Sequence, residues 1–464
     1  MKKLKDISLT SWTLFLIGLV SLLPFILLSF YTVPNLEDYA ESIIPGVWWH
    51  VKFLYLTYDG RFFTSFMFAA LNPLKYQHFT AYQWIPLVLI VSLFLSFFLF
   101  IRTFLFSNKM NALCLSAIIL SLYFIRNPNL AYSFYYMISS YVYMLPSILF
   151  IVYLSISYRL IESIQSNFPL LLLSSFLIFC IAGGNELYLI PLLLWLMFLW
   201  FKNYRQDLHK HAELFALSIA LFCAFFIVFT SPGTQRFVAE NKTPITLNNL
   251  FDAANLSFNF TLQQLRSWYS CNLLLLFLSL LIIYFFQSID LNKTANWSLR
   301  KSSFLFFLSF VLGLFIILPY TFAAGGKVSV SYTQIYIIPY LYYTLIGVLF
   351  LATVSKHIPK LPRKKVISIG LLTFIILSGY LDKNNQIKLA YQDLISGSAK
   401  AYYNEVNEQI SRSLKAPKSI ELCFLKNKPR QIFSGVYFNQ ETENFHLAYR
   451  LYYHIDELIV KECP

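Results

Sequence analysis

Long apolar runs recur along most of this chain, and no other feature constrains its fold as much. Many are about 20 residues long, the length at which an α-helix crosses the hydrocarbon core of a bilayer. A transmembrane β-barrel would instead show segments of about 10 residues with alternating hydrophobicity. The pattern predicts an all-α polytopic membrane protein with about 11 transmembrane helices, at residues 12–31, 82–106, 111–125, 143–161, 168–182, 187–201, 213–230, 271–289, 303–323, 333–355 and 366–380.

The composition excludes a soluble globular protein. The chain is 58% hydrophobic and 12% charged, whereas soluble domains carry about 25% charged residues. Its 47 Phe and 32 Tyr suit lipid-facing helices with aromatic rings at the headgroup level.

The first apolar run follows a basic start, as in a signal peptide. The stretch from Trp12 to Tyr31 is too long for the apolar centre of a signal peptide, and no A-x-A cleavage site follows it. We expect a retained first helix that acts as a signal anchor, with the N-terminus in the cytoplasm.

The distribution of basic residues sets the expected orientation. With the N-terminus inside, seventeen of the 36 Lys and Arg fall in short inner segments, and eight fall in much longer outer loops. This is the positive-inside bias of membrane proteins. The net charge of +14 is therefore mostly an orientation signal, and we expect membrane lipids rather than nucleic acid as partners.

An odd number of spans leaves residues 381–464 outside the cytoplasm, as a small α/β domain appended to a transmembrane domain, 1–380. After Pro417 the stretch IELCFL favours a strand. Cys423 and Cys463 lie in this tail and would pair in an oxidising compartment. No CxxC or Cys/His cluster predicts a zinc site. Before Pro417, one apolar helical face is expected from Ile387, Tyr391, Leu394, Tyr402, Val406 and Ile410.

The outer face of this topology collects the polar motifs. The first outer loop, 32–81, contains LEDYAE and TYDGRFF, and its short apolar stretch 62–74 predicts an interfacial or re-entrant helix. The inner loops are short, basic and without such motifs. The other outer motifs are SFYYMISSYVYMLP at 133–146, GGNE at 183–186, SPGTQR at 231–236 and AAGGK at 323–327.

Each acidic residue in these motifs has a structural reading beside the functional one. Glu37 and Asp38 suit the exit of the first helix or a cap on the next helix, as well as catalysis. Asp59 and Arg61 suit an ion pair within a turn. Glu186 is the sharpest candidate, because a carboxylate between apolar helices is costly unless it is paired or hydrated.

Two basic residues complete the outer set. Arg236 follows a Pro-Gly turn and equally suits a side chain that snorkels toward the headgroups. Lys327 equally suits an ordinary loop. His50 and His78 are isolated in the sequence, and no role is assigned to them.

Together these residue types suit sugar transfer from a lipid phosphate. A substrate that enters from the membrane needs Arg or Lys at headgroup depth to bind its phosphate. Transfer onto a hydroxyl needs a carboxylate that takes the proton, or a metal that screens the leaving phosphate. The candidates for catalysis are Asp38, Glu37 and Glu186, and those for substrate binding are Asp59, Arg61, Asn185, Arg236 and Lys327.

The order of these motifs resembles the GT-C superfamily of polyprenyl-phosphate-sugar glycosyltransferases, in which a long outer loop opening with an acidic pair follows the first helix. More narrowly, LEDYAE, YDGRFF, SFYYMISSYVYMLP, GGNE, SPGTQR and the tail phrase NFHLAYRLYY resemble an uncharacterised family of bacterial multi-spanning membrane proteins. The resemblance covers most of the chain. The sequence departs from the family's pattern at Glu37, Asp59, residues 137–140 and Thr234, which leaves the catalytic details open.

The resemblance implies inverting transfer outside the bacterial cytoplasmic membrane, from a polyprenyl-phosphate-linked sugar to a glycan, lipid or protein of the cell envelope. Asp38 would be the base, or a ligand of a divalent metal such as Mg²⁺ or Mn²⁺, and Glu37 is the second choice. Glu186 would orient the substrate or act as a second acid. Arg61 and Arg236 would hold phosphate.

Three other classes stay open, one of them a purely structural assembly factor. An O-antigen-type polymerase or ligase also handles lipid-linked glycans outside, but it relies on arginines and needs no acidic pair. A lipid-linked glycan transporter or flippase would show charged or broken helices at mid-membrane depth and repeat symmetry, and the sequence shows neither.

Overall fold

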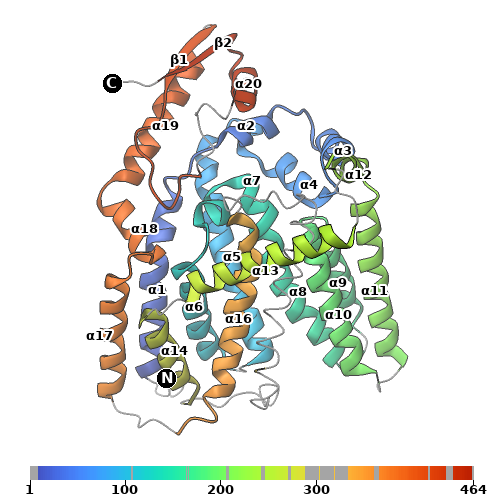
Figure 1. Ribbon diagram of the computed structural model, residues 1–464, viewed down its shortest axis with the longest axis vertical. Coiled ribbons are helices and arrows are strands. Elements are labelled where there is room, and N and C mark those ends of the chain that lie inside the picture. Colours follow the sequence, from blue (N-terminus) through green and yellow to red (C-terminus); the bar gives the residue numbers. More distant parts are fainter. Residues whose placement is uncertain are drawn as a thin grey trace.

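The computed structural model of the protein is almost entirely helical (Figure 1). It describes residues 9–105, 108–163, 167–204, 208–241, 246–269, 273–287, 333–359, 365–415, 418–434 and 443–461.

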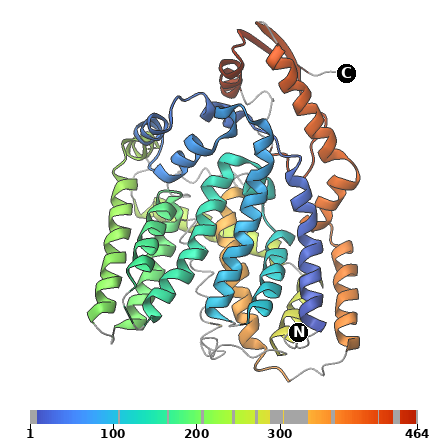
Figure 2. The same ribbon diagram turned by 180° about the vertical axis from the view of Figure 1, so that it is seen from behind.

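A bundle of apolar helices forms the body of the molecule (Figures 1 and 2). The predicted run 303–323 lies outside the described residues, and each of the other predicted runs coincides with a helix. These helices are α1 (Leu9–Ser29), α5 (Trp84–Phe104), α6 (Lys109–Ile125), α8 (Leu145–Glu162), α9 (Phe168–Ala182), α10 (Leu189–Asn203), α11 (Leu208–Phe229), α14 (Leu273–Gln287), α16 (Ile337–Val354, preceded by the 3₁₀ turn Thr333–Tyr336) and α17 (Lys365–Leu381).

The bundle is that of a membrane-associated protein. Within the described residues, five helical segments are long and apolar enough to cross a membrane, and further apolar helices are shorter. The five are Phe79–Phe104, Met137–Glu162, Glu186–Asn203, Leu208–Phe229 and Ile337–Val354.

Short helices cover one end of the bundle, at the top of Figure 1. The first outer loop supplies α2 (Leu36–Ser42), α3 (Val47–Thr57) and α4 (Phe62–Leu71), followed by 3₁₀ turns at Pro73–Tyr76 and Phe79–Gln83. The short helix expected within 62–74 is thus confirmed as α4. Beside them lies α12 (Pro232–Asn241), which packs against α3.

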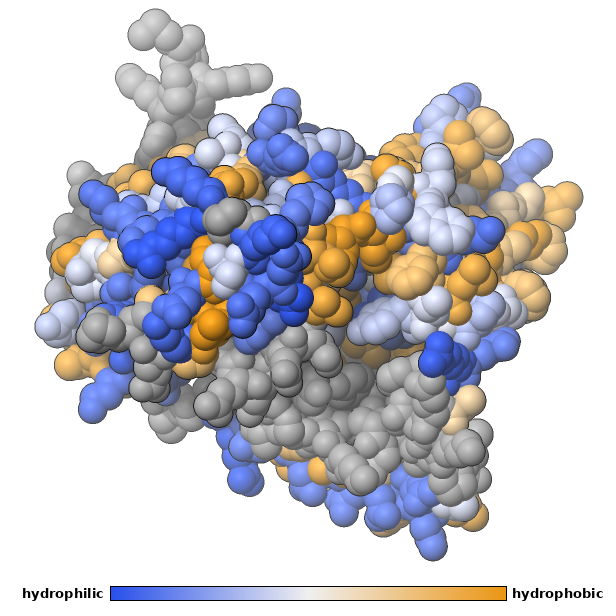
Figure 3. Space-filling view, turned by 90° about the horizontal axis from the view of Figure 1, so that it is seen from above, coloured by the Kyte–Doolittle hydropathy of each residue, from blue (hydrophilic) through white to orange (hydrophobic). Residues whose placement is uncertain are grey.

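This end has a mixed surface. Seen from above, hydrophilic and hydrophobic side chains alternate over it (Figure 3). Trp48 and Trp49 of α3 are exposed, and Lys52 lies over the Trp49 ring. Exposed Trp beside Lys is typical of a helix at the level of lipid headgroups.

The aromatic motif at 133–146 is buried within the bundle rather than arranged as a surface loop. The π-helical turns Ala131–Tyr135 and Ser140–Met144 flank α7 (Met137–Ser139) and lead directly into α8. Tyr135 donates a hydrogen bond to the Phe25 carbonyl of α1 (2.9 Å). This burial indicates that the aromatic side chains of the motif serve packing.

A long amphipathic helix, α13 (Leu247–Tyr269), crosses the bundle obliquely at about mid-height (Figure 1). These residues lie in the expected outer loop between the predicted runs 213–230 and 271–289, where the sequence predicts no helix. The buried stripe of α13 consists of small side chains, Ala253, Ser257 and Thr261, spaced four residues apart. The larger apolar side chains Leu250, Phe251 and Phe258 are exposed, and the Asn and Gln residues of this helix interrupt any long apolar run.

The tail folds against the first helices of the chain. It contains α18 (Gln386–Ile395), α19 (Ser398–Lys415), β1 (Ser419–Cys423), α20 (Glu443–Tyr453) and β2 (Glu457–Lys461). β1 and β2 form a two-stranded parallel sheet in which Ser419 pairs with Glu457, so the strand expected at IELCFL is confirmed.

The expected helical face of the tail is divided between two helices. Gly397, with a φ of +75°, separates α18 from α19, and Tyr402 and Val406 of α19 are buried. Cys423 takes part in a disulfide bond. Cys463 lies outside the described residues, so the pairing of these two cysteines stays a prediction.

Close backbone approaches explain the glycines of three sequence motifs. A Cβ on Gly60 would collide with the Val228 carbonyl of α11, and one on Gly233 would lie 2.7 Å from the Tyr58 amide nitrogen. A Cβ on Gly183 would collide with the Phe62 ring. The YDGR, SPGT and GGNE turns therefore interlock.

We expect Gly60→Ala to destabilise the protein by about 1–3 kcal/mol, because its methyl group meets backbone atoms that cannot move aside. Gly347→Ala is the matched control, since a Cβ there meets no atom within 4 Å. Thermal unfolding of the purified protein measures both. Equal melting temperatures for the two variants would contradict the interlocked packing.

Candidate functional site

Asp38 is fully buried in the first turn of α2 and caps that helix. Its Oδ2 accepts a hydrogen bond from the Asn35 backbone N–H (2.7 Å), completing a reciprocal capping box. Its Oδ1 is buried, and the Ile138 backbone N–H lies close enough to Asp38 to stabilise the carboxylate. Burial raises the pKa of Asp38 well above its usual range. The hydrogen bond from Asn35 lowers this pKa, and the charges of Glu37 and Glu41 raise it further.

Glu37 and Glu41 lie one turn apart on α2 and are partly exposed. Burial, followed by the charge of Glu41, raises the pKa of Glu37 to about 7. A carboxyl with that pKa exchanges its proton near neutral pH, as a general acid or base must. Glu37 therefore has the more suitable position and ionisation for proton transfer, while Asp38 holds the helix that carries it.

A buried histidine links Glu41 to a lysine. His50 of α3 is fully buried, with Nε2 2.5 Å from Glu41 Oε2 and Nδ1 2.7 Å from Lys75 Nζ. A protonated Lys75 donates to Nδ1, which leaves Nε2–H to donate to Glu41. The three side chains come from α2, α3 and the 3₁₀ turn Pro73–Tyr76, so they fix the fold of the outer loop around α2.

Arg61 joins the outer loop to the GGNE turn. Its Nε and Nη2 donate to the two carboxylate oxygens of Glu186, at 2.7 and 2.6 Å. Asp59 accepts from the Arg61 backbone N–H (3.0 Å), and its carboxylate lies 3.6 Å from Nη1. Thr64 of α4 donates to the Gly184 carbonyl (2.6 Å) beside this pair. The ion pair expected within YDGR exists, but the tighter partner of Arg61 is Glu186.

The two acidic groups, that of α2 and that around Arg61, lie within electrostatic reach of each other. Burial raises the pKa of Tyr58, Arg61 lowers it, and the charges of Asp59, Glu37 and Glu41 raise it. Burial also raises the pKa of Asp59, whereas the positive charge of Arg61 lowers it. The charges of Glu186 and Glu41 raise it further. The structure thus brings Asp59, Arg61 and Glu186 into one site, and Glu37 of α2 lies within electrostatic reach of the neighbouring Tyr58.

The tail covers the side of α2 that faces away from the bundle. Tyr39 packs edge-on against Tyr449 and Tyr452 of α20, at ring distances of 4.8 and 5.2 Å. Its hydroxyl lies 3.1 Å from that of Tyr453. The Ser434 hydroxyl donates to Asn35, which caps α2. LEDYAE and NFHLAYRLYY are therefore one packed unit.

The remaining predicted residues are placed differently. Asn185 is fully buried, donates to the Val142 carbonyl (3.0 Å) and accepts from the Leu187 amide (3.0 Å), so its amide group supports the turn. Arg236 is exposed on α12. Lys327 lies outside the described residues.

The described residues contain no group of three or more His, Cys, Asp and Glu side chains arranged to hold a metal ion. The carboxylates around Arg61 are instead paired with its guanidinium.

Comparison with known proteins adds no identity. No family model matches the chain, and no curated protein and no solved structure matches it.

Glu37→Gln should stabilise the protein more at pH 8 than at pH 5. The pKa of Glu37 is raised on folding, so the folded state binds more protons than the unfolded state between about pH 4.5 and 7, and stability falls as pH rises through that window. Glutamine removes this penalty. Melting temperatures at both pH values test it, with Glu408→Gln on the exposed face of α19 as control. An increase in melting temperature for Glu37→Gln that is the same at both pH values would contradict the raised pKa of Glu37.

Glu186→Gln should destabilise the protein by about 1–3 kcal/mol, because the partly buried Arg61 guanidinium loses its bidentate partner. Glu162→Gln removes the partner of Lys202 in an exposed pair and should cost less than about 1 kcal/mol. Thermal unfolding compares the two variants. A smaller loss for Glu186→Gln than for Glu162→Gln would show that the Arg61 pair does not hold the turn.

Proposed function

We propose that the protein is an integral-membrane glycosyltransferase that moves a sugar from a polyprenyl-phosphate carrier to a cell-envelope glycan, lipid or protein. The observation that carries this proposal is the site of Asp59, Arg61 and Glu186, with the acidic helix α2 packed beside it, at one end of an apolar helical bundle. A lipid-linked sugar that lies in the membrane presents its phosphate and sugar at this depth.

Glu37 is the proposed base in this reaction. The acceptor hydroxyl gives its proton to the Glu37 carboxylate as its oxygen attacks the sugar carbon, and the bond from that carbon to the phosphate oxygen breaks with inversion. The pKa of about 7 keeps a large ionised fraction at neutral pH. Asp38, the first choice from the sequence, supports α2 and stays a candidate that the same experiment tests.

Arg61 is the proposed phosphate ligand. Two carboxylates neutralise its guanidinium, so a phosphate gains access only if one of them withdraws or takes a proton. Asp59 is the weaker partner, at 3.6 Å, and its pKa is raised, chiefly by burial. We therefore expect the donor phosphate to replace Asp59 on Nη1 while Glu186 keeps its two hydrogen bonds and orients the guanidinium.

The proposed setting is the outer face of a bacterial cytoplasmic membrane. About eleven spans with a cytoplasmic N-terminus would put the first outer loop and the tail, 381–464, on the extracytoplasmic side. The packing of α20 against α2 supports a common side for these two segments. The tail would then border the site and contribute to acceptor binding.

Transfer from a panel of radiolabelled polyprenyl-phosphate sugars by the purified protein tests this proposal. We expect Glu37→Gln to lower the rate by about 10²-fold or more, the usual scale for a lost proton acceptor. Arg61→Ala should lower it by about as much, the scale for a lost charged hydrogen-bond donor to the reacting group. Glu408→Gln should keep wild-type activity. Addition of EDTA or of Mg²⁺ and Mn²⁺ separates a metal-dependent reaction from the metal-free one proposed.

The same assay distinguishes the alternatives. Activity that survives Glu37→Gln but not Asp38→Asn moves the base to Asp38. Polymerisation of a lipid-linked oligosaccharide that tolerates both changes supports the polymerase or ligase class. Movement of the lipid across vesicles without transfer of sugar supports a flippase.

A further inference from the structure

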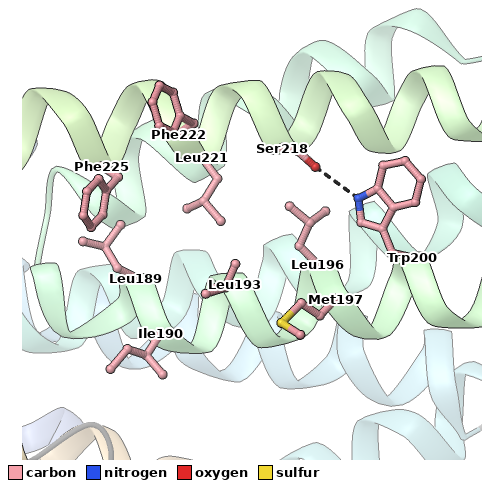
Figure 4. Close-up of a pocket in the computed structure, with 10 residues that line it drawn as sticks. All are labelled: Leu189, Ile190, Leu193, Leu196, Met197, Trp200, Ser218, Leu221, Phe222 and Phe225. Carbon is pink, nitrogen blue, oxygen red and sulfur yellow. Dashed lines mark hydrogen bonds between the residues drawn. The ribbon is translucent and has the colours of Figure 1, made fainter.

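An open apolar groove lies between α10 and α11 (Figure 4), with a volume of about 580 Å³. Leu196 and Leu221 are buried at its floor, whereas Leu193, Met197 and Phe222 are half exposed or more along its walls. No described element covers these wall residues. In Figure 4 the side chains of α11 face those of α10 across the groove.

The two ends of the groove differ in chemistry. Leu189 lines one end, three residues after Glu186, which binds Arg61. At the other end the Trp200 indole N–H donates to the Ser218 hydroxyl (3.1 Å) across the two helices. At 1.5 Å per residue, the distance from Leu189 to Trp200 is about 16 Å, or about half of the hydrocarbon core of a bilayer.

The lining suits a hydrocarbon chain better than a partner helix. Transmembrane helices approach each other through Gly, Ala and Ser, whereas this groove presents Leu, Phe and Met. Such flexible or bulky side chains adapt to a chain of irregular shape. Both helices lie in segments long and apolar enough to cross a membrane, so the groove opens to lipid.

We infer that the groove between α10 and α11 holds the hydrocarbon chain of a polyprenyl phosphate, with the phosphate at the turn where Glu186 binds Arg61. This inference rests on the proposed function, because the occupant is the chain of the proposed donor. Arg61 lies near one end of the groove, where an amphiphile with an anionic head would place its phosphate, whereas Lys202, near the other end, is paired with Glu162. The part of the chain beyond Trp200 continues into the bilayer.

Binding of undecaprenyl phosphate to the full-length protein in nanodiscs tests the inference. Leu193→Trp and Met197→Trp fill the groove and should weaken binding by about tenfold or more, the loss expected when about two methylene groups are displaced. Met197→Ala removes lining without adding bulk and should also weaken binding. Ile219→Trp adds the same ring to an exposed position of α11 outside the groove and should bind as wild type.

Dioleoyl phosphatidylglycerol serves as the competing lipid. We expect it to bind all variants alike, because an annular lipid does not depend on the groove. Equal binding of undecaprenyl phosphate to every variant overturns the inference, and so does an equal loss of both lipids. Groove-dependent binding by a protein that transfers no sugar supports the groove and contradicts only the proposed function.

Discussion

The bidentate pair between Arg61 and Glu186 is the interaction on which the upper end of this molecule depends. A carboxylate between apolar helices is costly unless a cation meets it, and Arg61 comes from a loop 125 positions earlier in the chain. The pair therefore fixes the outer loop on the α9–α10 turn. Gly183 leaves room for the Phe62 ring of the loop, and Gly60 lets the loop approach the Val228 carbonyl of α11. Removing either partner would leave the other as a partly buried, unpaired charge and would loosen the loop.

The site contains more carboxylates than basic side chains, and this imbalance determines its chemistry. Arg61 serves two carboxylates, and Lys75 reaches Glu41 only through His50. The excess negative charge, together with burial, keeps Glu37 near the midpoint of its titration at neutral pH. Proton transfer and phosphate binding are coupled in such a site, because a phosphate dianion is accepted most readily when a neighbouring carboxyl is protonated.

The sequence analysis predicted the parts of the fold that depend on lipid, because length and hydropathy report membrane burial directly. The helix α13 was missed, because its Asn and Gln residues interrupt any long apolar run. A cap on the next helix was one expected role of Glu37 and Asp38, and Asp38 has this role in the structure. Glu41, His50 and Lys75 were missed, because three segments meet only in the folded chain, and no local pattern in the sequence pairs them. The functional assignment rests on chemistry and on the resemblance, and the structure adds the proximity of the charged groups.

Photo-crosslinking tests the central claim, that a polyprenyl-phosphate sugar binds at the end of the bundle carrying α2 and the GGNE turn. A donor with a diazirine next to its phosphate would be irradiated with the purified protein, and the labelled peptides identified by mass spectrometry. We predict label in residues 32–81 and 183–191, lost when unlabelled undecaprenyl phosphate is added in excess. Competed label confined to the opposite end, at residues 102–110 and 159–168, would contradict the account.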